Sequence, residues 1–216
     1  MSLHVLDIPA TAPQTGTVIW LHGLGATCHD FEPVVPLLHR PDLRFLLPQA
    51  PQRPVTINGG FVMPAWYDIR TMEQTPDRND PAHIAQAQGW LEELIAQQIQ
   101  AGVPSQRIAL IGFSQGGAMA LHTGLRHASK LAGMAVLSAY LLLPETLQAE
   151  QSQANLQTPV FFGHGLYDPV VGRSAGKAAY DAVGHQRASW RDYPMEHEVC
   201  LEEIEDLRVF LQAVLA

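Results

Sequence analysis

One serine of the chain lies in a pattern that can turn it into a nucleophile. Ser114 has Gly112 and Gly116 two positions away on either side, and it follows the apolar run at residues 108–111. A strand that turns sharply into a helix needs such small residues, because its two arms approach closely and present the hydroxyl at the end of a sheet. The pattern predicts that Ser114 is an acyl-transfer nucleophile. The alternative is an ordinary strand-to-helix turn without a chemical role.

A serine hydroxyl is a weak nucleophile, so it needs a base within hydrogen-bonding reach. The chain offers 10 histidines. Parallel-sheet enzymes place their sites at the carboxyl ends of the strands, so the base is expected to follow a strand. His197 does so, after the run at residues 188–193, whereas His185 follows a predicted helix. We predict His197 as the base, and a solvated or capping histidine is the alternative.

The same argument selects an acid that orients the base. Asp168 follows the run at residues 159–164 and therefore comes to the same predicted edge of the sheet. Glu196 and Glu198 flank His197 and remain rival acids, although chain neighbours rarely point back at the same imidazole ring. Serine, acid and histidine then occur in the chain order described for α/β-hydrolases. The predicted triad is Ser114, Asp168 and His197.

Acyl transfer also requires donors for the negative charge that develops on the carbonyl oxygen. One backbone donor is expected from Gln115, directly after the nucleophile, and the second from a loop that follows an early strand. The run at residues 17–21 leads into His22, Gly23, Leu24 and Gly25. We assign the second donor to Leu24, because the two glycines allow the backbone to approach a substrate. A glycine turn that only reverses the chain is the alternative.

Short apolar runs alternate with segments of helical period, which is typical of strands and helices in a parallel sheet. The predicted strands are residues 17–21, 43–47, 107–111, 133–137, 159–164 and 188–193, with 3–8 as a weaker edge strand. A first helix is expected from the spacing of Ile84, Ala87, Leu91, Leu94, Ile95 and Ile99, between Asp80 as cap, Pro81 in the first turn and Gly102 as stop. Further helices are expected at residues 115–127, 173–183 and 201–214.

Residues 48–80 show no sustained period and contain five prolines. A connection this long without secondary structure is uncommon in a compact domain and is usually functional. The segment also holds Trp66, Tyr67, Ile69 and Met72, which are unusual in a solvated linker. We interpret it as a wall or lid of a pocket. The alternative is that these side chains pack on the sheet edge without a chemical role.

Composition restricts the class of protein. A length of 216 residues suits one domain, taken here as residues 1–216, since domains typically hold roughly 100 to 200 residues. The chain has 13 basic and 21 acidic residues, and its net charge of −8 without a basic cluster argues against nucleic acids and anionic membranes as partners. No apolar run is long enough to span a membrane, and no export signal is evident. Cys28 and Cys200 are expected to be free thiols in the cytoplasm.

Six short motifs together carry a family resemblance. They are LHGLG at residues 21–25, PQAP at 48–51, WYDI at 66–69, GFSQGG at 112–117, HG at 164–165 with DPVV at 168–171, and HEV at 197–199. With them the sequence resembles the carboxylesterase and acyl-protein thioesterase family of small α/β-hydrolases. The resemblance implies a mostly parallel central sheet with helices on both faces. It also implies hydrolysis of carboxylic esters and thioesters without a metal or cofactor, often by a homodimer.

The resemblance further implies that the segment from Trp66 to Met72 lines the acyl site, with Ile69 and Met72 as the main contacts. The chain departs from the family pattern at Ala26, Cys28 and Asp30 in the oxyanion loop, and at Glu196, where the family usually has glycine. These departures change the surroundings of the site and leave every reacting group in place. From the resemblance we expect the substrates to be small acyl esters or acylated molecules with short- to medium-chain acyl groups.

Other functions remain open from the sequence. A lysophospholipase would need a longer groove beneath residues 48–80, and the sequence does not give its length. A non-catalytic binding protein on the same scaffold is a second alternative, since a fold does not define a function. A cofactor-free lyase or perhydrolase is a third, which no residue favours.

Overall fold

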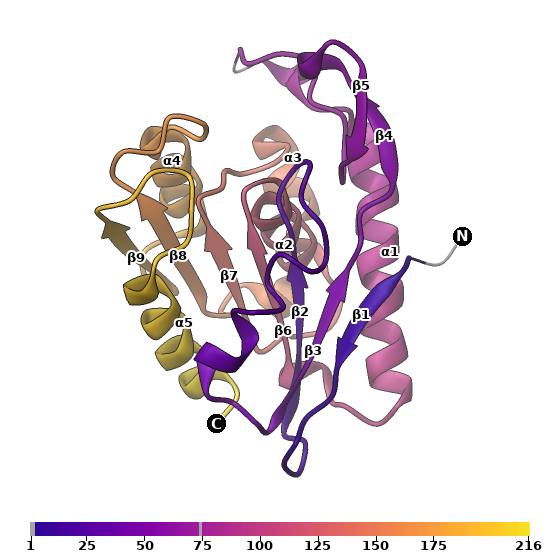
Figure 1. Cartoon of the computed structure of the whole chain (residues 1–216), viewed down its shortest axis with the longest axis vertical. Coiled ribbons are helices and arrows are strands. Elements are labelled where there is room, and N and C mark those ends of the chain that lie inside the picture. Colours follow the sequence, from indigo (N-terminus) through magenta and orange to yellow (C-terminus); the bar gives the residue numbers. More distant parts are fainter. Residues whose placement is uncertain (1–2, 74) are drawn as a thin grey trace.

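A seven-stranded sheet forms the centre of the protein, whose computed structural model describes residues 3–73 and 75–216 (Figure 1). The strand order is β1-β3-β2-β6-β7-β8-β9. The strands are β1 (Val5–Ile8), β2 (Gly16–Leu21), β3 (Leu43–Pro48), β6 (Ile108–Phe113), β7 (Gly133–Leu137), β8 (Val160–Gly165) and β9 (Ala188–Tyr193). Only β1 runs antiparallel, against β3, and the six other strands pair in parallel. Each predicted strand is present, including the edge strand.

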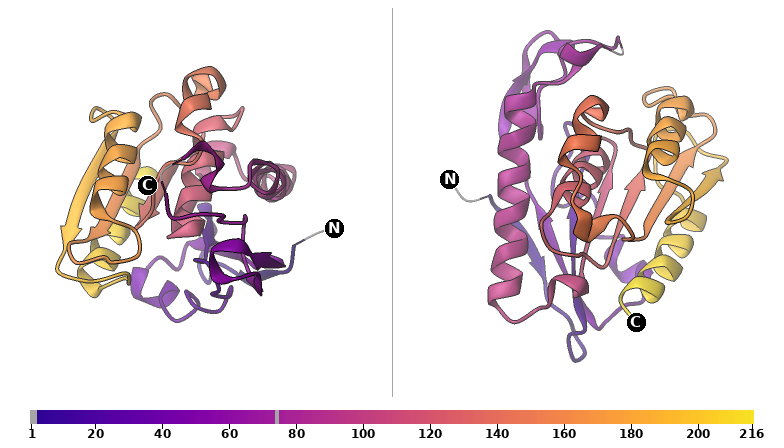
Figure 2. Two further views of the ribbon diagram at one scale, coloured as in Figure 1. Left: turned by 90° about the horizontal axis from the view of Figure 1, so that it is seen from above. Right: turned by 180° about the vertical axis from the view of Figure 1, so that it is seen from behind.

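Helices cover both faces of this sheet (Figure 2). On one face lie α1 (Pro81–Gln100), α2 (Gln115–Arg126), α3 (Pro144–Glu150) and α4 (Arg173–Val183). The other face is covered by α5 (Leu201–Val214) and the short 3-10 helix η1 (Val35–Leu38), which contact one another. Because both faces are buried, the central strands carry nearly unbroken apolar runs, and every residue of β2 is buried. The predicted α/β architecture is confirmed.

The first helix begins and ends as its sequence signals indicate. The side chain of Asp80 accepts hydrogen bonds from the amides of Ala82 and His83, and Pro81 occupies the first turn. Gly102 follows the helix with a φ of +95°, a conformation that favours glycine. The predicted apolar face is buried except for Ile99, which is 39% exposed in the last turn.

The segment at residues 48–80 contains a hairpin that the sequence did not predict. Strand β4 (Gln52–Val55) pairs antiparallel with β5 (Phe61–Pro64), and the hairpin projects beyond the carboxyl edge of the main sheet (Figure 1). Trp66 and Tyr67, directly after the hairpin, have no exposed surface and belong to the core. These two aromatic side chains are therefore packed in the core, as the alternative interpretation expected, and they do not line the wall of an open pocket.

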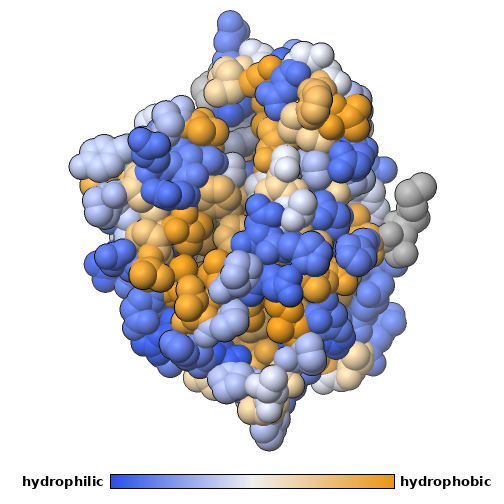
Figure 3. All heavy atoms as spheres, in the orientation of Figure 1, coloured by the Kyte–Doolittle hydropathy of each residue, from blue (hydrophilic) through white to orange (hydrophobic). Residues whose placement is uncertain are grey.

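Apolar side chains remain exposed at the hairpin. Phe61 is 69% exposed and Val62 is 55% exposed. Figure 3 shows apolar patches among polar ones at the top of the molecule, where the hairpin lies in Figure 1. In the ranges 3–73 and 75–216, no helix combines the length and apolarity required to cross a bilayer.

Candidate active site

Ser114 occupies a strained turn between β6 and α2, at the carboxyl edge of the sheet. Its φ of +53° is unusual for a residue with a side chain and marks a conformation that the surroundings must enforce. A Cβ at Gly112 would overlap the backbone of Gly116, and a Cβ at Gly116 would lie 2.5 Å from the carbonyl oxygen of Leu21. The two glycines are thus required by the close approach of strand and helix, as the motif predicts.

The structure brings together the three side chains of the predicted triad. The Nε2 atom of His197 lies 2.9 Å from Oγ of Ser114, and its Nδ1 atom lies 2.7 Å from Oδ2 of Asp168. Nδ1–H donates to the carboxylate, which leaves Nε2 to accept the proton of the serine hydroxyl. Glu196 and Glu198 are exposed, and neither has a recorded hydrogen bond to His197 within the described ranges.

The Asp168 carboxylate is held in place by its own loop. Oδ1 accepts hydrogen bonds from the amides of Val170 and Val171, both at 2.8 Å, and the side chain has no exposed surface. His164, at the end of β8, donates from Nε2 to the carbonyl oxygen of Val171 at 2.8 Å. Burial lowers the pKa of His164, which keeps this ring neutral. Sequence reasoning used His164 only as part of a motif and missed this supporting contact.

The two predicted oxyanion donors border the nucleophile. Gln115 begins α2 directly after Ser114, so its N–H is one of the free amides at the positive end of a helix. Leu24 follows Gly23, where an added Cβ would lie 3.4 Å from Cβ of Ser114. Neither amide has a protein acceptor among the residues that the structure describes. Both remain available for a substrate oxygen.

A series of hydrogen bonds connects the nucleophile turn to the loop that carries Leu24. The side-chain amide of Gln115 accepts from the N–H of Trp66 at 2.7 Å and donates to the carbonyl oxygen of Tyr67 at 2.8 Å. The indole N–H of Trp66 donates to the carbonyl oxygen of His22 at 2.8 Å. The buried Trp66 thus holds the loop that carries Leu24, and in this conformation it offers no surface to a substrate.

A cavity of about 340 Å³ opens beside Ser114. Its wall contains Ser114, His197 and Leu24. Further lining side chains are apolar or acidic: Phe31, Val34, Phe113 and Val199, and Asp30 and Glu198. Ala26 also lines it, so two of the departures from the family pattern border the nucleophile, whereas Cys28 is buried. Within the described part of the chain, Ile69, Met72 and Trp66 are not among its lining residues. Ile69 is 9% exposed, and Met72 is 57% exposed.

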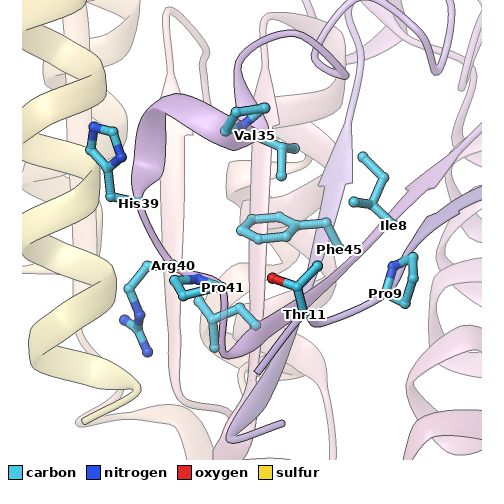
Figure 4. A pocket seen from close by; sticks show the side chains of 10 residues that line it. Ile8, Pro9, Thr11, Val35, His39, Arg40, Pro41 and Phe45 are labelled. Carbon is cyan, nitrogen blue, oxygen red and sulfur yellow. The ribbon is translucent and has the colours of Figure 1, made fainter. Parts of the chain in front are cut away.

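A larger cavity, of about 600 Å³, lies elsewhere on the molecule. Figure 4 shows it between the β1 and β3 edge and η1, lined by Ile8, Val35, Phe45 and Arg40. Arg40 is already paired through two hydrogen bonds with Asp42. None of the triad or donor residues lines this cavity. The described ranges also contain no group of three or more His, Cys, Asp or Glu residues arranged to hold a metal ion.

Comparisons with known proteins identify the family of the chain. A family model for phospholipase/carboxylesterase matches residues 7–215. The acyl-protein thioesterase 1 of Neurospora crassa is 40% identical over 219 residues, which cover 95% of this chain and 89% of that protein. The acyl-protein thioesterase 1 of Gibberella zeae is 40% identical over 224 residues, with coverage of 97% and 95%.

A solved structure gives the same result. The crystal structure of Zea mays acyl-protein thioesterase 2 superposes with a TM-score of 0.89 at 25% identity and covers 99% of each chain. The resemblance drawn from the six motifs is therefore confirmed, as is the α/β-hydrolase fold. The chain belongs to the phospholipase/carboxylesterase family and is a hydrolase of the ester and thioester class.

Proposed function

We propose that this hydrolase cleaves carboxylic esters and thioesters of short- to medium-chain acyl groups through an acyl-enzyme intermediate. Ser114 is the nucleophile, His197 is the base, and Asp168 orients His197. The separation of 2.9 Å between Nε2 of His197 and Oγ of Ser114 is the observation that carries this proposal. A base at this distance can take the hydroxyl proton as the oxygen attacks.

The reaction proceeds in two stages. Oγ of Ser114 attacks the substrate carbonyl carbon while its proton moves to Nε2 of His197, and the oxyanion accepts hydrogen bonds from the amides of Leu24 and Gln115. The tetrahedral intermediate collapses, and His197 returns the proton to the leaving alcohol or thiol. Water then attacks the acyl-serine with His197 again as base, which releases the carboxylic acid and restores Ser114. Asp168 stabilises the imidazolium that forms in each stage.

The cavity beside Ser114 suits the leaving group. His197 must protonate the departing oxygen or sulfur, and His197 lies in the wall of this cavity. The apolar side chains of Phe31, Phe113 and Val199 favour leaving groups with an apolar body. We assign the acyl chain to the side of Ile69 and Met72, as the family resemblance implies.

The names of the relatives extend the proposal to thioesters and acylated proteins. The proteins from Neurospora crassa and Gibberella zeae are named acyl-protein thioesterases, which supports a thioester among the substrates of this chain. The family description also includes phospholipases, so a lysophospholipid is the alternative substrate. A homodimer and a cytoplasmic location remain predictions from the sequence.

Active-site labelling and hydrolysis test the proposal together. A fluorophosphonate should modify Ser114 and abolish hydrolysis of p-nitrophenyl butyrate and of a butyryl thioester. Ser114→Ala should lose both the labelling and the hydrolysis while its circular dichroism spectrum stays unchanged. Hydrolysis that persists in Ser114→Ala would exclude Ser114 as the nucleophile. A rate series over ester chain length then reports the depth of the acyl site directly.

A further inference from the structure

The ring of His22 has hydrogen bonds on both of its nitrogen atoms. Its Nε2 atom accepts the backbone N–H of Ala50 at 3.0 Å, and its Nδ1 atom lies 2.7 Å from the carbonyl oxygen of Gly23. A backbone amide is always a donor, so Nε2 carries no proton and Nδ1–H must donate to Gly23. Burial lowers the pKa of His22, and the side chain is 1% exposed. The ring is therefore a neutral donor with a defined tautomer.

This donor bonds the peptide group that supplies a proposed oxyanion donor. The carbonyl of Gly23 and the N–H of Leu24 belong to one planar trans peptide, so they point in opposite directions. With its oxygen directed at His22, the peptide directs its N–H away from the ring. That N–H has no protein acceptor in the described ranges, and Leu24 lines the cavity that contains Ser114. A second, longer bond from the amide of Ala26, at 3.3 Å, also reaches the oxygen of Gly23.

We propose that His22 is a positioning residue of the oxyanion hole, whose Nδ1–H sets the direction of the Leu24 amide. This inference rests on the proposed function, because it assigns a purpose to an orientation that only acyl transfer uses. Backbone donors contribute most when their direction is fixed before the reaction, and a small misplacement is costly. His22 itself does not touch the substrate, since the Gly23–Leu24 peptide lies between them.

Two substitutions test the donor at Nδ1 and the acceptor at Nε2 of His22 separately. His22→Asn can place its amide N–H near the position of Nδ1, so it keeps the donor to Gly23 and loses the acceptor for Ala50. His22→Gln can place its carbonyl near the position of Nε2, so it keeps the acceptor for Ala50 and loses the donor to Gly23. A role in packing alone predicts that activity follows stability in both variants. The positioning role predicts that the two properties separate.

We expect kcat for p-nitrophenyl butyrate to fall by about 10- to 100-fold in His22→Gln with little change in KM. In His22→Asn kcat should stay within about fivefold of the parent, because the peptide is still held. The unfolding temperature should rank the other way, with His22→Asn lower, because it leaves the Ala50 amide unpaired. The affinity for a trifluoromethyl ketone, which forms a tetrahedral adduct with serine, should fall in parallel with kcat.

His122 supplies the matched control. It is 2% exposed on α2, bonds Gln88 and does not line the cavity beside Ser114. His122→Asn and His122→Gln should change kcat only as far as they change stability. The inference is overturned if His22→Gln is as active as His22→Asn, or if activity follows unfolding temperature in all four variants. Failure of the proposed mechanism would appear in a different experiment, as hydrolysis that persists in Ser114→Ala.

Discussion

Gln115 and Trp66 lie 49 residues apart in the chain, and the side-chain carbonyl of Gln115 accepts the backbone N–H of Trp66 at 2.7 Å. Both residues are buried. Gln115 therefore has two parts with different tasks: its backbone N–H borders the nucleophile, and its side chain anchors the segment after the hairpin. Through the indole of Trp66, that segment bonds the carbonyl of His22 and so contacts the loop of the proposed second donor, Leu24.

Gln115→Ala separates these two roles, because alanine at this position keeps the backbone N–H and removes the side-chain amide. The substitution leaves the N–H of Trp66 and the carbonyl of Tyr67 without their partner, which should cost about 1–3 kcal/mol of unfolding free energy. We also expect kcat to fall by roughly tenfold as the donor loop loses its anchor. Urea unfolding and steady-state kinetics measure both effects. An unchanged kcat at reduced stability would show that the anchor does not serve the site.

Asp168→Asn tests the orienting acid. By the behaviour of other triads, kcat should fall by up to about 10⁴-fold because an amide favours the wrong tautomer of His197, while the fold is retained. Glu196→Gln and Glu198→Gln should each lower kcat by less than about tenfold, since both side chains are exposed. The rates are compared on the same p-nitrophenyl ester, with circular dichroism as the check on folding. If Asp168→Asn stays within tenfold of the parent, one of these glutamates must take the role.

The charges at the cavity predict a preference among leaving groups. Asp30 and Glu198 line the cavity, and no lysine or arginine is among its lining residues within ranges 3–73 and 75–216. S-butyrylthiocholine should therefore be preferred over its uncharged 3,3-dimethylbutyl analogue, which has the same shape and acyl group. Asp30→Asn and Glu198→Gln should each lower the ratio of the two kcat/KM values by about two- to fivefold, because exposed carboxylates contribute less than about 1 kcal/mol.

Two controls sharpen this measurement of charge preference. Glu93→Gln removes an exposed carboxylate on α1, on the far face of the sheet, and should leave the ratio unchanged. High salt should reduce the ratio of the parent protein towards that of the variants, since screening weakens exposed charges. A ratio that no substitution alters would show that the carboxylates do not face the leaving group.

One rule selected all three residues of the predicted triad, and the structure places their side chains within hydrogen-bonding distance of one another. Ser114, Asp168 and His197 each follow a strand, and the carboxyl ends of parallel strands lie at one edge of a sheet. A residue far away in the chain can then be placed without knowing any side-chain contact. The cap at Asp80 was equally accessible, because a helix start is a local signal.

Contacts that form only when distant parts of the chain pack together could not be predicted from the sequence pattern. Pro54 and Pro64 obscure the alternation of β4 and β5, so the hairpin had no readable period. Trp66 looked like a substrate contact because it is an aromatic residue in a long loop, yet its indole N–H is bonded to His22 in the core. His22 donates to a neighbouring carbonyl, and its Nε2 atom accepts from Ala50, which lies just after the adjacent strand β3. Such tertiary hydrogen bonds leave no pattern in one sequence.

Glu203 links the stability of the protein to pH. It lies in the first turn of α5 with no exposed surface, and neither carboxyl oxygen has a hydrogen-bond partner in the described ranges. A Cβ at Gly163 of β8 would overlap this carboxyl group, so the glycine makes room for it. Burial, aided by the charge of Asp206, raises the pKa of Glu203 to about 8. The folded protein therefore holds a proton at neutral pH that the unfolded chain releases.

The sign of the pH effect follows from this proton. Between the unfolded pKa of about 4.5 and the folded pKa of about 8, the native state binds the extra proton, so stability falls as pH rises. The slope from this group is about 1.4 kcal/mol per pH unit. Glu203→Gln cannot ionise, so its unfolding free energy minus that of the parent should increase from pH 5.5 to 7.5 and level off above pH 8. Urea unfolding at each pH measures the difference, with Glu202→Gln on the same turn as the exposed control. A difference independent of pH would mean that Glu203 finds a partner for its charge, which would place a compensating group or water beneath α5.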